Sequence, residues 1–535
     1  MILSLMLAFL AGAFCLLASI QFCHMFQLEG YKPKGYFRWL GETGVQRIFY
    51  IFLLAGIFIV AAVMTAAVKM LPAGFSHFSL SWIGCILFTA AFAVLGAIYM
   101  RRFAIKNAKK PLVYTARVKR LLFTEVLLIL VFSLVGSASG AAILGVMILL
   151  CPMLILLANA VNAPAECLVR RHYYNDAKKK LALHSDIIKI GITGSYGKTS
   201  TKFILGTILS EKYNVLVPPG SYNTPMGLTR VIRENLTDAH QVFLAEMGAK
   251  NVGDIYELVD MVRPKYGIIT SVGPQHLESF KTIENVARAK YELIEGLPQD
   301  GCAFFVNDGA LVKQMYDKTA IKKYLYAICS EQDEWDVAAK DIASGEDGST
   351  FCIVTKDGAF SASTKLLGRN NIRNILGCVA IAKELGLTEE QITRGIAKIQ
   401  PVEHRLQILP GNNGVTVIDD AFNANPEGCR IAMEVLSGFQ GRKFVVTPGM
   451  VELGTVEERE NFLFGERIAE AADFVFLVGP KHTLPIYQGI EQAGFNMDHV
   501  FVVNSLAEAS SELGKLLRTG DVVLFENDLP DNYNE

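Results

Sequence analysis

The segment best suited to chemistry in this sequence is a glycine-rich turn, Thr193-Gly194-Ser195-Tyr196-Gly197-Lys198-Thr199-Ser200. It follows an apolar stretch and opens a helical pattern. Backbone N–H groups in such a turn bind phosphates, Lys198 neutralises their charge, and Thr199 can hold Mg²⁺. The strict nucleotide-loop spacing fails, because Ile192 stands where its first glycine should be. A purely structural turn is the alternative, and Gly-Lys-Thr between a strand and a helix favours phosphate binding.

Single polar residues downstream of the turn have two interpretations each. Glu246 ends an apolar strand, where a carboxylate either binds a nucleotide-bound Mg²⁺ or caps the strand in solvent. His276 alone is more typical of a structural histidine than of a metal ligand, because histidine ligands usually occur in spaced groups. Lys290 has the pattern of an ordinary helix-surface lysine. The residues alone leave these roles open.

Several motifs, taken in order, resemble the Mur ligases, which build the peptide of bacterial cell-wall precursors. The resemblance covers about residues 188–525 and is closest to the branch that adds D-alanyl-D-alanine. Besides the turn, the motifs that carry it are Asn223-Thr224-Pro225-Met226-Gly227, Val242–Gly248, Ser271–Glu278, Ala289-Lys290-Tyr291-Glu292, Leu367–Asn374, His404-Arg405, Asp419–Pro426, Pro448–Gly454 and Gly465-Glu466.

This resemblance implies a role for each matched residue. Thr199, Glu246, His276 and Lys290 would serve two Mg²⁺ sites, with Lys290 carbamylated by CO₂ so that it becomes anionic. Asn374 would contact adenine, Arg405 would reach the γ-phosphate, and Asp420 would act on the ribose or phosphate side of ATP. The residues expected to be catalytic are Lys198, His276, Lys290 and Arg405. Those expected to bind the nucleotide are Gly194, Ser195, Gly197, Lys198, Thr199, Ser200, Asn374, Arg405 and Asp420.

The chain also departs from the family pattern. Ser271 and Asn370 replace an Asn and a His of the family motifs. Near residue 525 the branch has Lys-Gly-Ser-Arg, which grips the incoming amino compound, whereas this chain has Phe525-Glu526-Asn527-Asp528. The chemistry of ATP therefore transfers with the resemblance, and the identity of the substrates does not.

Alternating strands and helices after Asp186 predict a mostly parallel sheet covered by helices on both faces. A second strand series begins near Pro401 and predicts a smaller Rossmann-like α/β domain. We therefore expect a central ATP-binding domain at 188–400 and a C-terminal domain at 401–535, with a hinge near 400–405. The expected strands are 187–193, 242–246, 267–272 and 302–306, followed by 415–419, 443–447, 474–478, 500–503 and 522–525.

The first 165 residues have a different composition. They carry 13 Lys/Arg and 3 Asp/Glu, whereas the remainder carries 38 and 49. We expect an α-helical membrane domain at 1–165 with five spans, at 1–26, 48–68, 80–100, 121–135 and 141–161. A basic linker at 166–187 follows. Glu125 lies within the fourth span, where it is either functional or a residue that reaches the membrane surface.

The distribution of basic residues predicts the orientation of this domain. Basic loops remain in the cytoplasm, and the loop after the third span holds eight basic residues between Arg101 and Arg120. We therefore expect a multi-pass protein of the cell membrane with its N-terminus outside and its catalytic domains in the cytoplasm. The ten cysteines contain no C-x-x-C pair, and the acidic second half argues against nucleic acid as a partner.

Together these features predict a membrane-anchored, ATP-dependent carboxylate–amine ligase acting through an acyl phosphate. The expected partners are ATP, membrane lipid, an amino acid or dipeptide that supplies the amine, and a carboxylate acceptor such as a lipid-linked cell-wall precursor. The alternatives are a poly-γ-glutamate-type amide ligase, a phosphate-loop transport motor and a nucleotide-binding regulator.

Overall fold

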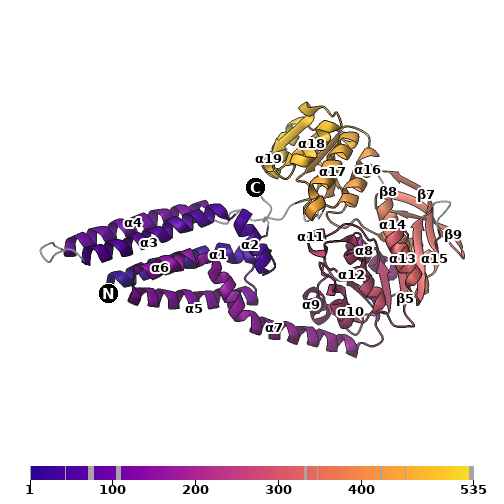
Figure 1. Ribbon diagram of the computed structural model, residues 1–535. Coiled ribbons are helices and arrows are strands. Elements are labelled where there is room, and N and C mark those ends of the chain that lie inside the picture. Colours follow the sequence, from indigo (N-terminus) through magenta and orange to yellow (C-terminus); the bar gives the residue numbers. More distant parts are fainter. Residues whose placement is uncertain are drawn as a thin grey trace. The chain divides into compact units, whose positions relative to one another are not determined.

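The computed structural model describes residues 2–42, 44–69, 77–103, 110–329, 334–345, 348–421, 424–451 and 453–528. Residues up to Arg170 form one compact unit, and Arg171–Asp528 form another. Figure 1 shows a purely helical first unit and a second unit of sheets and helices.

The first unit is built from apolar helices. Helix α1 packs on α5 and α6, and α3 packs on α4 and α6. Their shared core contains many aromatic and small residues, among them Phe14, Phe22, Ala11 and Ala18. The helices are α1 (Ile2–Leu28), α2 (Pro33–Glu42), α3 (Val45–Lys69), α4 (His77–Arg102), α5 (Ala116–Ser139), α6 (Ala141–Leu149) and α7 (Cys151–Leu183).

Four helices in the described part of the chain are long and apolar enough to cross a membrane. They are Leu5–Leu28, Val45–Met64, Ala116–Ala138 and Cys151–Leu183. The expected span at 80–100 lies within α4, where the described side chains begin at residue 86. The count of five spans and the insertion itself therefore stay predictions.

The expected span at 141–161 is not one helix. It is divided at Leu150 into α6 and α7. Pro152 has no backbone N–H to donate to the preceding turn, so the helical hydrogen-bond ladder is interrupted there. The expected linker at 166–187 is also helical as far as Leu183, because α7 continues through it.

Glu125 does not reach the surface of the helical unit. Its side chain is 1% exposed and accepts a hydrogen bond from Ser19 Oγ at 2.8 Å. The interpretation of Glu125 as a surface-reaching residue is therefore wrong.

The second unit contains a nine-stranded sheet in the order β2-β3-β1-β4-β5-β6-β7-β8-β9. Strands β1 to β7 pair in parallel, whereas β8 is antiparallel to both β7 and β9. The strands are β1 (Ile188–Thr193), β2 (Val215–Leu216), β3 (Val242–Glu246), β4 (Tyr266–Ile269), β5 (Cys302–Val306), β6 (Lys322–Ile328), β7 (Val337–Gly345), β8 (Gly348–Thr355) and β9 (Gly358–Thr364).

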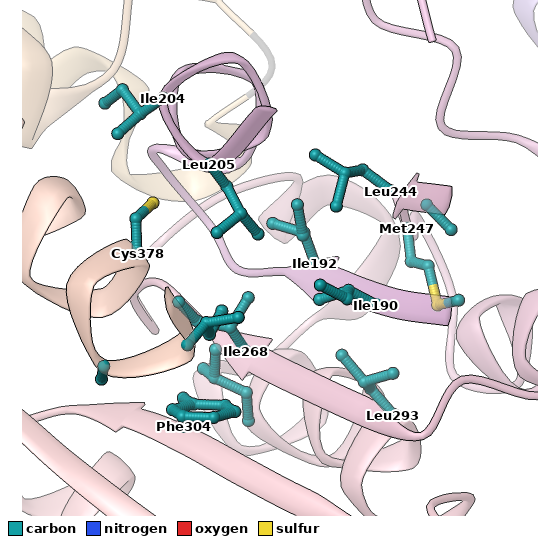
Figure 2. Packing of buried hydrophobic residues seen from close by; sticks show 14 of the residues in the cluster. Ile190, Ile192, Ile204, Leu205, Leu244, Met247, Ile268, Leu293, Phe304 and Cys378 are labelled. Carbon is teal, nitrogen blue, oxygen red and sulfur yellow. The ribbon is translucent and has the colours of Figure 1, made fainter. Parts of the chain in front are cut away.

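Helices cover the parallel part of this sheet and close its core. Figure 2 shows Ile190 and Ile192 of β1 among Leu205, Leu244 and Ile268, all fully buried. Strands β3 and β5 are buried at every residue, which is typical of a parallel sheet with helices on both faces. The helices are α8 (Lys198–Leu209), α9 (Pro225–Asn235), α10 (Asp254–Val262), α11 (Leu277–Phe280), α12 (Ile283–Glu295), α13 (Ala310–Lys318), α14 (Arg369–Glu384) and α15 (Glu389–Lys398).

A second sheet has the order β10-β11-β15-β12-β13-β14 and is parallel except for β10. Its strands are β10 (Gln407–Pro410), β11 (Thr416–Asp420), β12 (Lys443–Thr447), β13 (Phe474–Val478), β14 (Val500–Val503) and β15 (Val522–Glu526). The accompanying helices are α16 (Pro426–Ser437), α17 (Glu457–Ala471), α18 (Leu484–Gln492) and α19 (Leu506–Leu516), with short 3₁₀ turns η1 (Asn412–Gly414), η2 (Gly454–Val456) and η3 (Met497–His499).

The α/β fold and its strands are confirmed where the sequence predicts them. Strands β3, β5, β12, β13 and β14 have the expected bounds. The antiparallel extension β7-β8-β9 was not expected, because its strands alternate polar and apolar residues instead of forming buried runs. The domain bounds 188–400 and 401–535 stay predictions.

Candidate active site

The glycine-rich turn joins β1 to α8 at the carboxyl edge of the parallel sheet. Gly194 has a φ of 155° and Gly197 a φ of 80°. A Cβ on Gly194 would stand 2.1 Å from Thr270 Oγ1. Only glycine allows the turn to pass this close to β4. Helix α8 begins at Lys198 without a side-chain cap, so its first N–H groups remain available for an anion.

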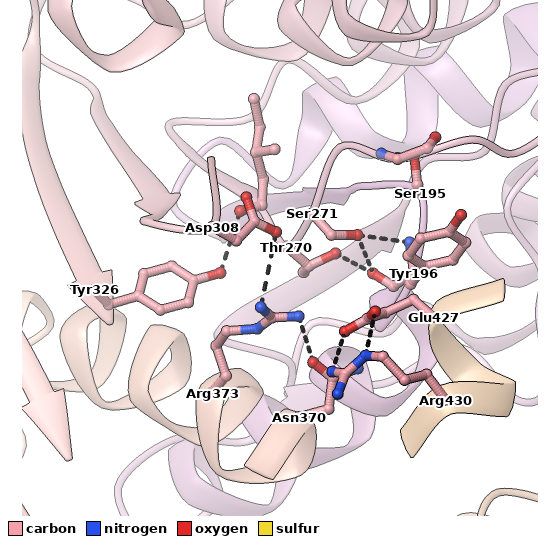
Figure 3. A network of polar contacts seen from close by, with 12 residues as sticks. Ser195, Tyr196, Thr270, Ser271, Asp308, Tyr326, Asn370, Arg373, Glu427 and Arg430 are labelled. Atoms are coloured by element: carbon pink, nitrogen blue, oxygen red, sulfur yellow. Dashed lines mark hydrogen bonds and ion pairs between the residues drawn. The ribbon is translucent and has the colours of Figure 1, made fainter. Parts of the chain in front are cut away.

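The loop after β4 holds the turn in place (Figure 3). Ser271 Oγ accepts the Tyr196 N–H at 2.7 Å and donates to the Tyr196 carbonyl at 3.1 Å. Ser195 Oγ donates to the Gly273 carbonyl at 2.9 Å. Ser271, which replaces the Asn of the family motif, thus holds the phosphate turn in place through two hydrogen bonds to the Tyr196 backbone.

Lys198 folds back over the turn. Its Nζ donates to the carbonyls of Gly194 at 2.6 Å and Ser195 at 3.0 Å. Burial lowers the pKa of Lys198 to about 8, an effect that Glu246 opposes and Arg405 reinforces. A phosphate offers a stronger acceptor than two carbonyls, so the ammonium is placed to exchange these partners for a nucleotide.

Glu246 is the centre of a buried polar cluster at the end of β3. Its side chain is 1% exposed. Its Oε1 accepts from Thr199 Oγ1 at 3.0 Å and from Asn223 Nδ2 at 3.1 Å, and its Oε2 lies 3.2 Å from Lys202 Nζ. Lys202 was not predicted as a member of this cluster. The signal was its position four residues after Lys198 on the same helix, which places both on one side of α8.

The cluster has oxygen ligands that suit Mg²⁺. A threonine hydroxyl and a carboxylate lie together beside the phosphate turn, and hard divalent cations prefer oxygen donors. Within the described ranges, no group of three or more His, Cys, Asp and Glu residues could hold a metal ion. A metal here would therefore rely on Thr199, Glu246 and oxygens brought by the nucleotide.

His276 and Lys290 come after this cluster in the chain and lie in different surroundings. Lys290 lies on α12, is 1% exposed and has its Nζ 6.0 Å from the Phe280 ring. Burial lowers the pKa of Lys290 well below its usual value, and the charge of nearby Lys198 lowers it further. Lys290 is therefore not the surface lysine that its pattern alone suggests. His276 precedes α11 in a left-handed conformation with a φ of 51°.

Asn374 lies against the phosphate turn. A Cβ on Gly197 would come 2.7 Å from Asn374 Oδ1, and Asn374 is 6% exposed. Nearby on α14, Arg373 hydrogen-bonds Asn370 and lies 3.9 Å from Asp308 Oδ2 (Figure 3). Burial raises the pKa of Asp308 to about 6. The structure thus brings the segment with the expected adenine contact to the turn.

Arg405 and Asp420 form the second part of the site. Burial lowers the pKa of Arg405, while the charges of Asp420, Glu246 and Glu526 raise it. The positive charge of Arg405 also lowers the pKa of Lys198. Burial raises the pKa of Asp420 to about 6, against the effect of Arg405. Glu526, for which the sequence predicts no role, is 1% exposed and pairs in register with Asp420.

Comparisons with known families place two consecutive matches on this chain. Residues 192–382 match the Mur ligase middle domain, and residues 404–526 match the Mur ligase glutamate ligase domain. Between them, the two matches contain the site residues described above.

Two relatives that are similar to this chain have the same name. The UDP-N-acetylmuramoyl-tripeptide–D-alanyl-D-alanine ligase of Bacillus subtilis is 26% identical over 340 residues, which is 63% of this chain and 72% of that protein. The ligase of the same name from Mycobacterium bovis is 30% identical over 360 residues, 63% of this chain and 69% of that protein.

Solved structures agree with these relatives. MurF from Acinetobacter baumannii superposes with a TM-score of 0.62 at 25% identity, covering 68% of this chain and 78% of that one. MurF ligase from Thermotoga maritima in complex with ADP gives a TM-score of 0.60 at 25% identity, covering 67% and 80%.

Proposed function

Because this chain belongs to the Mur ligase family and is an ATP-dependent ligase, we propose that it is a membrane-anchored enzyme that joins a carboxylate to an amine through an acyl phosphate. The observation that carries the proposal is the position of Lys198 and the start of α8 beside the Thr199–Glu246 pair. This arrangement presents N–H groups, a cation and oxygen ligands together, as ATP bound to Mg²⁺ requires.

In the first step the acceptor carboxylate attacks the γ-phosphorus and ADP leaves. The N–H groups of the turn and Lys198 stabilise the negative charge on the phosphate oxygens. Arg405, whose field reaches the same region, would bind the γ-phosphate. Mg²⁺, when held by Thr199 and Glu246, supplies further charge neutralisation. In the second step the amine displaces phosphate and the amide forms.

Lys290 would serve the same site in a modified form. Burial lowers the pKa of Lys290 and so raises the fraction of the neutral amine, which is the form that adds to CO₂. Carbamylation would convert Lys290 to an anion, which a second cation site needs. An unmodified ammonium there would repel a metal ion.

The proposed substrates follow the names of the relatives. A UDP-muramoyl tripeptide and D-alanyl-D-alanine are the substrates in those names, so we propose that this chain acts in peptidoglycan synthesis on a carboxylate precursor and a dipeptide or amino acid. A lipid-linked form of the precursor is the acceptor we favour, because an anchored enzyme meets a membrane-held substrate at raised effective concentration.

The decisive experiment measures ADP release by the purified full-length protein. We expect release only when Mg²⁺, a carboxylate acceptor and an amine are all present. A transport motor or a regulator would release ADP without both substrates, or not at all. Supplying the UDP-linked and the lipid-linked tripeptide in parallel separates the two acceptor classes, and faster turnover of the UDP-linked form would reject the lipid-linked proposal. A poly-γ-glutamate-type ligase would instead extend glutamate polymers.

The proposed localisation has its own test. A reporter fused after Glu166 should be cytoplasmic, and one after Ser137 should be external. The sequence also predicts an external reporter at residue 73, a position outside the described residues. An external reporter after Glu166 would separate the ligase from ATP and reject the whole proposal.

A further inference from the structure

The last helix of the apolar first region continues into the second unit. Helix α7 runs from Cys151 to Leu183, and its residues from Arg171 onward belong to the second unit. Ala177 and Leu181 are buried in the core that surrounds β1, and Tyr174 packs against the same core. The final turns of α7 are therefore built into the unit that carries the candidate active site.

Tyr174 and Lys178 hold the C-terminal half of α10. Lys178 Nζ donates to both carboxylate oxygens of Asp260, each at 2.7 Å. The Tyr174 hydroxyl donates to the Glu257 carbonyl at 3.0 Å and lies 3.2 Å from Asp260 Oδ2. Because Tyr174 and Lys178 are four residues apart on a helix, they lie on one face of α7. That face contacts α10 through both of its polar side chains.

The other end of α10 is held by Glu292. Helix α10 begins after Gly253, which has no side chain to cap it. Instead, the two carboxylate oxygens of Glu292 accept the Gly253 N–H at 2.6 Å and the Tyr256 N–H at 3.0 Å. A carboxylate suits this place because the first N–H groups of a helix lack partners and carry the positive end of its dipole. Helix α10 is thus fixed at both ends.

The fixed start of α10 belongs to the surroundings of Lys290. Glu292 follows Lys290 by two residues on α12, and α10 packs on α12. Burial and the charge of Lys198 lower the pKa of Lys290, whereas the charges of Asp254 and Glu292 raise it. Asp254 is the first residue of α10. A shift of α10 would therefore displace Asp254 and disturb the contacts of Glu292.

We propose, on the basis of the proposed ligase activity, that Tyr174 and Lys178 are positioning residues for the Lys290 site. They hold α10, and α10 in turn holds Asp254 and Glu292 in place beside Lys290. The nine residues of α10 span about 13 Å at 1.5 Å per residue, and a helix this short moves as a rigid body. A contact at one of its ends therefore sets the position of the other.

The phosphate turn is held by different contacts. Ser271 binds the Tyr196 backbone, and Ser195 donates to the Gly273 carbonyl, all on the side of β4. Loosening α10 should therefore disturb the Lys290 site and spare nucleotide binding. This separation distinguishes a positioning role of α7 from a general contribution to folding.

The test reverses one charge of the contact between α7 and α10 in the full-length protein. The assay contains ATP, Mg²⁺, D-alanyl-D-alanine and whichever tripeptide acceptor, UDP-linked or lipid-linked, the wild type uses. We expect Lys178→Asp to lower kcat by about 10- to 100-fold, because a small displacement of a supporting group is enough for such a loss. The KM for ATP and the stoichiometry of nucleotide binding should not change. Lys178→Arg keeps a two-pronged contact with Asp260 and should retain the wild-type rate.

Two further variants complete the test. Lys178→Asp combined with Asp260→Lys restores the ion pair in reverse and should recover kcat. The matched control is Lys265→Asp, because Lys265 Nζ pairs with Asp300 at the same distance of 2.7 Å and joins the chain before β4 to the chain before β5. This variant should leave kcat unchanged.

Three outcomes would overturn the inference. They are a loss of kcat that the reversed pair does not recover, an equal effect of Lys178→Asp and Lys265→Asp, and a parallel loss of turnover and nucleotide binding in Lys178→Asp. The last of these would show an effect on folding as a whole. A wild-type protein that forms no amide would instead reject the proposed function.

Discussion

Asn374 packs on Gly197 so closely that a single added methyl group on the glycine would stand 2.7 Å from Asn374 Oδ1. The second turn of α14 and the phosphate turn are therefore in contact without a bound nucleotide. If Asn374 contacts the base, as the family resemblance implies, one contact positions the phosphate and base regions relative to each other.

This contact predicts the effect of Gly197→Ala. The new Cβ would displace Asn374, and the φ of 80° would strain any residue other than glycine. We expect a loss of about 1–3 kcal/mol in the free energy of unfolding and weaker ATP binding. Gly514→Ala on α19 is the control, because no atom lies within 4 Å of its added methyl, and it should gain about 0.5–1 kcal/mol. Denaturant unfolding and nucleotide titration measure both. Unchanged ATP affinity in Gly197→Ala would contradict the assigned position of the nucleotide.

Lys198→Ala should abolish turnover. The ammonium is the cation placed over the phosphate turn, and removal of one such group in other enzymes costs about 10²–10³-fold in kcat. Lys340→Ala, at an exposed position on β7, is the control for loss of a lysine charge. ADP release measures both variants. Full turnover by Lys198→Ala would show that the phosphate site lies elsewhere.

Lys290 should prove to be carbamylated. We expect a carbamate signal from the protein in ¹³C-labelled bicarbonate and its loss in Lys290→Ala. That variant should regain part of its activity when a short carboxylate such as acetate is added, because a free anion can replace the missing one. Lys290→Glu should retain more activity than Lys290→Ala. Wild-type behaviour of Lys290→Ala would disprove the carbamate.

The buried ion pair of Lys202 and Glu246 predicts a strong coupling in stability. Its side chains are 0% and 1% exposed, so removing either partner leaves an uncompensated buried charge. Lys202→Met alone should cost about 3–5 kcal/mol, and Glu246→Gln a similar amount. The double variant should cost much less than the sum of the two. Additive losses in a double-mutant cycle would show that the pair does not interact.

Asp420 predicts a pH dependence of stability. Its pKa is raised from 3.8 to about 6, so the folded state binds more protons than the unfolded state between these values. Stability from this group therefore falls as pH rises from about 4 to 6 and stays reduced above. Asp420→Asn should remove this slope and gain about 1–3 kcal/mol at pH 8. Denaturant unfolding at several pH values measures it. The same slope in wild type and Asp420→Asn would contradict the prediction.

The sequence was most informative where buried strands end in polar residues. The run Val242–Glu246 predicts both β3 and the carboxylate at its end, because a fully buried parallel strand reads as an uninterrupted apolar stretch. The phosphate turn was also predictable, because glycines followed by a lysine between a strand and a helix are typical of phosphate binding.

Interactions that depend on distant parts of the chain were not predictable. Lys202 reads as a surface lysine until Glu246, which is 44 residues away, is placed beside it. Glu526 acquires its environment only when β15 is inserted next to β11. The division at Leu150 had a local signal in Pro152, but the apolar composition on both sides hid it.

The position of β15 also affects how the protein is synthesised. Residues 522–526 form an interior strand, between β11 and β12, which precede it in the chain by about a hundred and about eighty residues. A nascent chain that has not yet released this strand from the ribosome presents two unpaired strand edges, and such edges associate readily with other chains. Sheet closure must therefore wait until translation has passed residue 526. A premature stop codon in the preceding hundred codons would leave an aggregation-prone product instead of a slightly shortened enzyme.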